Sequence, residues 1–129
     1  MPWLKPARPK TRKELGRISE DHAARFLASK GYRIRERNYR TPRGEIDIIA
    51  EKRDVLIFIE VKARSSDEHG RPLESVTSPK QRTISAVAGI YLSTREKRER
   101  LTRFDVVEVH ITPQGRVTNV EVVEGAFRG

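Results

Sequence analysis

Two strongly apolar segments, residues 46–50 and 55–63, lie on either side of four charged residues. Apolar runs separated by so short a polar turn predict a β-hairpin. Each run contains a carboxylate, Asp47 in the first and Glu60 in the second. Both faces of the second run are largely apolar, so we expect an interior strand that is covered on both sides. An unpaired carboxylate is costly in such a strand.

Two registers of this hairpin are open from the sequence. If residues 53–54 form the tip, Asp47 lies directly opposite Glu60. If the tip is shifted to residues 52–53, Asp47 lies opposite Phe58 and the two acids are diagonal neighbours. In either register both carboxylates lie on one face, because side chains alternate faces along a strand.

Lys62 follows Glu60 by two residues and therefore shares its face. Cross-strand neighbours lie roughly 5 to 8 Å apart, so the two acids repel unless something holds them. Mg²⁺ or Mn²⁺ bound by Asp47 and Glu60 would do so, since these cations prefer oxygen ligands. A lysine beside such a metal suits metal-assisted phosphodiester hydrolysis. The alternative is an ion-pair network without metal, in which Lys62 and nearby arginines neutralise the acids.

The rest of the chain predicts two helices and further strands. Apolar residues recur at helical spacing from 11 to 30, and Gly31 is typical of a helix C-terminus. Ser78 and Pro79 suit the N-cap and the first residue of a second helix. The expected strands are 32–39, 45–50, 55–63, 104–109 and 116–123, with a polar loop at 64–77.

This order predicts an α/β domain with a mixed β-sheet flanked by helices. The first three strands form a meander, and the next helix leads to a parallel strand through a right-handed crossover. The length of 129 residues favours one domain, which we place at 11–129. Residues 1–10 hold three prolines and three basic residues, and we expect a flexible basic arm there.

The charge balance indicates an anionic partner. The chain has 27 basic and 18 acidic residues, for a net charge of +9, which favours nucleic acid. It has no cysteine, which excludes disulfides and thiolate chemistry, and no apolar run near the roughly 18 residues of a membrane span. We therefore expect no membrane association and a cytoplasmic location. The candidate phosphate-binding residues are Arg40, Arg43, Arg64, Lys80, Gln81 and Arg82.

Other polar residues carry weaker signals. The histidines at 22, 69 and 110 lack the spacing of a zinc site, and we expect all three at the surface. Asp105 stands in an apolar strand, where pairing with a neighbouring arginine would explain it.

Asp47 followed by Glu60-Val61-Lys62 is similar to the hallmark of the PD-(D/E)XK nuclease superfamily. A closer resemblance covers residues 14–127, which resemble the YraN-like family of small bacterial proteins. The matching segments are KGYRIRERNYR at 30–40, GEIDIIA at 44–50, FIEVKAR at 58–64 and RFDVV at 103–107.

The resemblance implies a restriction-endonuclease-like core similar to archaeal Holliday junction resolvases. In that core a glutamate on the first helix joins the site, and Glu20 occupies its place; the family usually has glycine where this chain has Ser19. The implied activity is metal-dependent endonuclease cleavage of DNA, at branched or damaged sites, with Glu20, Asp47, Glu60 and Lys62 as catalytic residues. The alternative is a non-catalytic nucleic-acid-binding adaptor in DNA repair or recombination. Such relatives commonly act as homodimers.

Overall fold

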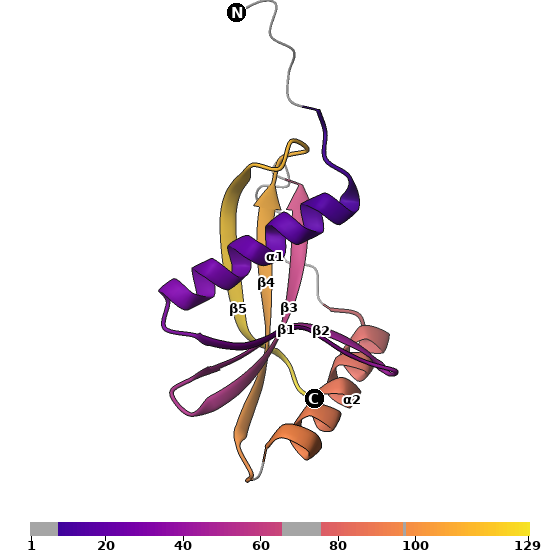
Figure 1. Ribbon diagram of the computed structural model, residues 1–129, viewed down its shortest axis with the longest axis vertical. Helices are drawn as coiled ribbons and strands as arrows, with labels where there is room; N and C mark the ends of the chain where they lie inside the picture. Colours follow the sequence, from indigo (N-terminus) through magenta and orange to yellow (C-terminus); the bar gives the residue numbers. More distant parts are fainter. Residues whose placement is uncertain (1–7, 66–75, 97) are drawn as a thin grey trace, which may run out of the picture.

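The computed structural model describes residues 8–65, 76–96 and 98–129. Five strands form one sheet in the order β1-β2-β3-β4-β5, in which β3 and β4 are parallel and the other neighbours antiparallel (Figure 1). The elements are α1 (Arg12–Ser29), β1 (Arg33–Thr41), β2 (Gly44–Lys52), β3 (Val55–Ser65), α2 (Ser78–Arg95), β4 (Leu101–Ile111) and β5 (Val117–Phe127). The predicted α/β fold, the meander and the parallel crossover are confirmed.

Two sequence predictions fall partly on residues that the structure leaves undescribed. Residues 1–7 of the expected arm lie outside the described chain, while Lys10 donates its N–H to the Pro113 carbonyl at 2.7 Å. Residues 66–75 of the expected loop also lie outside it, and β3 extends to Ser65 before them. Neither helix of the described chain is long and apolar enough to cross a membrane.

Helix α1 begins and ends where the sequence indicates. The Thr11 hydroxyl accepts from the Glu14 N–H, and the Glu14 carboxylate accepts from the Thr11 N–H, which completes a capping box. Gly31 follows the helix with φ of +91°, a conformation that glycine adopts without strain. The buried face of α1 packs on one side of the sheet, against a cluster that includes Ile57 and Val107.

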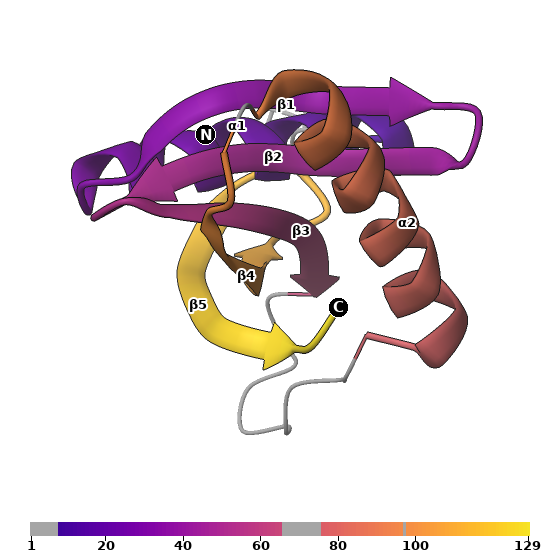
Figure 2. The same cartoon turned by 90° about the horizontal axis from the view of Figure 1, so that it is seen from below.

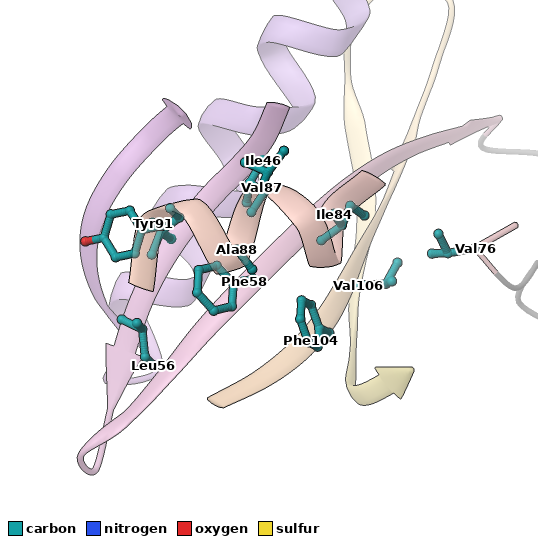
Figure 3. Close-up of a cluster of buried hydrophobic side chains, with 11 residues drawn as sticks. Ile46, Leu56, Phe58, Val76, Ile84, Val87, Ala88, Tyr91, Phe104 and Val106 are labelled. Carbon is teal, nitrogen blue, oxygen red and sulfur yellow. The ribbon is translucent and has the colours of Figure 1, made fainter. Parts of the chain in front are cut away.

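The other face of the sheet carries α2 (Figures 2 and 3). Phe58 is the centre of its core, with its ring 6.0 Å from Tyr91 and 5.6 Å from Phe104. The prediction that Ser78 is the N-cap of α2 is wrong by one residue. Thr77 is the N-cap, because its hydroxyl accepts from the N–H three residues later, and the proline lies inside the first turn.

The β2–β3 hairpin adopts the first of the two registers that the sequence left open. Arg53 and Asp54 form its tip, with φ of 52° and 67°. Two consecutive left-handed residues are typical of the type I′ turn, which matches the twist of antiparallel strands. The register of the paired residues, continued by one position, places Asp47 opposite Glu60.

In β2 the alternation of side chains between the two faces of the sheet is interrupted at Asp47. Simple alternation predicts that Ile46 and Ile48 share a face, but Ile46 packs beside Val87 of α2 (Figure 3). Ile48 instead packs in the cluster under α1. In β1, Asn38 lies between the partners of these two isoleucines and has φ of 54°. This left-handed residue interrupts the regular pleat opposite Asp47, so the alternation fails there.

Candidate active site

Asp47 lies at a fork between β2 and β3. The ladder between these strands ends at the pair Ile48–Ile59, and beyond it β2 continues with β1 while β3 continues with β4 (Figure 2). Asp47 Oδ2 accepts a hydrogen bond of 2.8 Å from the Val61 N–H. The carboxylate therefore joins the two strands by a side chain where they separate. Among the described residues no donor forms a hydrogen bond with its other oxygen.

Glu60 lies across the fork from Asp47. Its side chain is 12% exposed, and the Lys80 ammonium lies 3.6 Å from its Oε1. Burial, and after it repulsion by Asp47, raises the pKa of Glu60 to about 7, against the weaker effects of Lys80 and Lys62. Burial also raises the pKa of Asp47, although the Val61 N–H opposes that rise. The fork thus holds two acids that do not readily ionise together.

Lys80 belongs to the fork as much as Lys62 does. It comes from the first turn of α2, and its positive charge lowers the pKa of both Glu60 and Asp47. Among the described residues no carboxylate lies within 4.0 Å of the Lys62 ammonium. The alternative of a metal-free network named Lys62 and nearby arginines; the structure adds Lys80, which lowers the pKa of Glu60 more than Lys62 does.

Glu20 approaches the fork from α1. Burial, followed by repulsion from Asp47, raises the pKa of Glu20, while Arg37 opposes the rise. Glu20 Oε1 is buried and has no hydrogen-bond partner among the described residues. The preceding Ser19 is also buried and its hydroxyl lacks a partner in the same part of the chain. Three acids from α1, β2 and β3 therefore meet at the fork.

The six candidate phosphate-binding residues do not gather in one place. Lys80 and the exposed Arg82 lie on the first turns of α2, where Gln81 donates to the Val76 carbonyl at 2.8 Å. Arg40 precedes the turn between β1 and β2 and Arg43 lies in it, and Arg40 pairs with the carboxylate of residue 45 at 2.6 Å. The sixth, at position 64 in β3, has a side chain only 17% exposed and pairs with an acid of β4.

A second group of possible metal ligands lies further along the sheet. Glu108 and His110 of β4 and Glu121 of β5 each offer one ligand atom, and these atoms lie within 4.8 Å of one another. The Arg64 guanidinium, 3.3 Å from Glu108, competes for the same carboxylate. The expectation of a surface position is wrong for His110, which is only 8% exposed. Sequence spacing missed this group because it spans two strands, although residues 108 and 110 share a strand face.

Asp105 has a structural role. It is fully buried, and both its oxygens accept from Arg103, at 2.8 and 2.9 Å. The Gly125 N–H adds a bond of 3.0 Å, and the Tyr32 hydroxyl lies at 3.4 Å. The predicted arginine partner is confirmed, and Asp105 is fully engaged away from the fork.

The fold and the fork define an α/β protein with three acids and two lysines gathered beside the central strands. The chain belongs to the uncharacterised protein family UPF0102, whose model matches residues 19–109. It is 44% identical to a UPF0102 protein of Dictyoglomus turgidum over 115 residues, which are 89% of this chain and 98% of that protein. It is 50% identical to a UPF0102 protein of Moorella thermoacetica over 117 residues, 91% of this chain and 98% of the relative. The resemblance to the YraN-like family of small bacterial proteins is thereby confirmed.

Proposed function

We propose that this protein is a metal-dependent nuclease that hydrolyses phosphodiester bonds in DNA. The observation that carries the proposal is the gathering of Asp47 and Glu60 at the fork, where Asp47 accepts a hydrogen bond from Val61, the residue after Glu60, with Lys62 next along the strand. Buried acids with strongly raised pKa values beside a specific charge partner are typical of functional sites. The similarity of this set to the PD-(D/E)XK hallmark supports the same chemistry.

The residues at the fork fit a divalent cation such as Mg²⁺ or Mn²⁺. Asp47 and Glu60 are both oxygen donors, and burial raises the pKa of each. A cation between them would replace protons and relieve their repulsion, which offsets the cost of burying two charges. Glu20, with an orphaned buried oxygen beside Asp47, is the third candidate ligand. When bound, such a cation supplies Lewis acidity and activates a water molecule.

The protein's own side chains would hold and polarise the substrate. Lys62 and Lys80 flank Glu60 and direct positive charge to the place where a phosphodiester would gain negative charge in the transition state. The Val61 N–H fixes the Asp47 carboxylate, so the acid is already oriented before substrate arrives. The net charge of +9 favours a polyanionic substrate over a neutral one. The likeness to Holliday junction resolvases points to branched DNA.

A second function is favoured by one specific contact. Lys80 lies 3.6 Å from Glu60, so the chain can neutralise part of its acid cluster without any metal. This neutralisation would be enough for an adaptor in repair or recombination, which uses the fold only to bind nucleic acid. The same basic surface serves both functions, because phosphate contacts supply most nucleic-acid affinity.

The experiment is a panel of labelled single-stranded, duplex, flap and four-way DNA substrates, each incubated with Mg²⁺, Mn²⁺ or EDTA. A nuclease cuts at least one substrate in a metal-dependent way, and Asp47→Asn and Glu60→Gln abolish cutting. Glu99→Gln is the matched control, because Glu99 is exposed and has no ion pair among the described residues. Binding to the panel without any cutting would reject the nuclease and favour the adaptor.

A further inference from the structure

A small hollow lies beside the fork, between the N-terminal half of α1 and the end of β1. Its volume is about 260 Å³. Its lining consists of Lys13, Gly16, Arg17, Glu20, Arg37, Asn38, Arg40 and Glu45. Glu20 belongs to the fork as well, so the hollow and the acid cluster share a wall.

One face of α1 forms a side of this hollow. Lys13, Gly16, Arg17 and Glu20 recur at the three- and four-residue spacing that places side chains on one helix face. Lys13 precedes Glu20 by seven residues, which is about 10 Å along the helix axis. A Cβ added at Gly16 would meet no atom within 4 Å, so the helix backbone is open to an approaching group there.

The hollow has basic side chains that are free to bind an anion. Among the described residues no carboxylate lies within 4.0 Å of the charged groups of Lys13 and Arg17, and both side chains are exposed. Arg37 forms an ion pair with Asp21 at 2.7 Å, and Arg40 forms one with Glu45 of β2 at 2.6 Å. Both pairs are exposed, and exposed pairs contribute little, so these arginines can change partner at low cost.

We infer that this hollow binds a backbone phosphate of the same nucleic-acid strand whose reacting phosphodiester lies at Asp47 and Glu60. Guanidinium groups match phosphate by paired hydrogen bonds, and the ammonium of Lys13 adds a point charge. The inference rests on the proposed function and deepens it. A second phosphate site beside the first requires a polynucleotide, and so excludes a mononucleotide phosphodiester as the substrate.

The test uses the full chain carrying Lys13→Ala and Arg17→Ala together. Alanine is the best helix former, so these exposed substitutions should leave the melting temperature unchanged. The matched control is the pair Arg25→Ala and Arg116→Ala, which removes the same charge from exposed residues outside the hollow. Fluorescence anisotropy with labelled DNA in EDTA measures affinity over a series of salt concentrations, where no metal-dependent cutting occurs.

The double variant of the hollow should bind DNA at least 10-fold more weakly at low salt. Its plot of log affinity against log salt should be shallower by about 1, because the hollow holds one phosphate and each lost phosphate contact lowers the slope by about 1. The control pair should keep the wild-type slope.

Equal losses in the two double variants, or no loss in the hollow variant, would overturn the inference. If the wild-type chain still cut DNA in a metal-dependent way, the proposed nuclease function would stand. A wild-type chain that neither binds nor cuts any DNA would instead reject both.

Discussion

Replacing Glu60 by glutamine tests the central physical claim about the fork without any substrate. Glutamine has nearly the shape of the protonated acid, keeps hydrogen-bonding atoms and removes the negative charge. Burial and Asp47 together raise the pKa of Glu60 from its ordinary value of 4.5 to about 7. Glu60→Gln should therefore stabilise the metal-free protein at alkaline pH.

The size and pH range of the effect follow from that pKa. Between about pH 4.5 and 7 the folded protein keeps a proton that the unfolded chain has released, so the wild-type loses stability as the pH rises through this window. Below it Glu60 is protonated in both states and causes no loss, and above it the loss is complete. The difference in pKa corresponds to about 3 kcal/mol, since one pKa unit is worth about 1.4 kcal/mol.

Urea unfolding in EDTA at pH 5 and pH 8 measures this effect. At pH 8 the variant should be more stable by about 3 kcal/mol, which moves the urea midpoint by roughly 1 to 2 M for a protein of this size. At pH 5 the two proteins should nearly coincide. Glu99→Gln is the control, because it measures how the loss of one exposed acid changes the stability of this basic chain. Saturating Mg²⁺ should stabilise the wild-type at pH 8 and leave Glu60→Gln unchanged.

Two results would refute the argument. A variant no more stable than wild-type at pH 8 would mean that Lys80 and Lys62 already compensate the buried charge. An equal gain at pH 5 and pH 8 would mean that the substitution acts by packing rather than by titration of Glu60.

Substitutions at three further positions have separate expected outcomes. Asp47→Ala should destabilise the protein by about 1 to 3 kcal/mol, because it leaves the Val61 N–H without its acceptor. Asp47→Asn should keep the fold but lose the Mn²⁺ binding that calorimetry measures. Equal stability of the two variants would contradict the role of this hydrogen bond. Lys62→Ala should leave the melting temperature and the Mn²⁺ affinity near the wild-type values, since Lys80 remains beside Glu60. It should reduce any DNA cleavage roughly 100- to 1000-fold. A large drop in melting temperature would instead indicate that Lys62 belongs to a structural network. Asp105→Ala should cost about 3 to 5 kcal/mol in urea unfolding, because it leaves a partly buried arginine without its partner, and a cost below 1 kcal/mol would show that the network relaxes.

The secondary structure and the two central acids could be predicted from local patterns in the sequence. Gly31 and the helical spacing before it set the end of α1 because these signals act within a few residues. The alternation of apolar side chains in β3 placed Glu60 and Lys62 on one face, since a strand repeats every two residues. Local rules were enough wherever the neighbours in space were also neighbours in the chain.

The register of the hairpin was decided by tertiary structure. Both tips were compatible with the sequence, and the chosen one needs left-handed backbone at Arg53 and Asp54, neither of which is glycine. The break in alternation at Asp47 depends on Asn38 in the neighbouring strand. Both features arise from pairing between strands, which single-strand periodicity does not encode.

The residues that surround the acids are brought there by the packing of the helices on the sheet. Lys80 reaches Glu60 because α2 packs on one face of the sheet, and Glu20 reaches Asp47 because α1 packs on the other. The basic hollow likewise needs α1 beside β1, and its residues Lys13 and Arg17 look like ordinary surface charges in the sequence. Such contacts join residues far apart in the chain, and their geometry follows from the packing of whole helices on a twisted sheet.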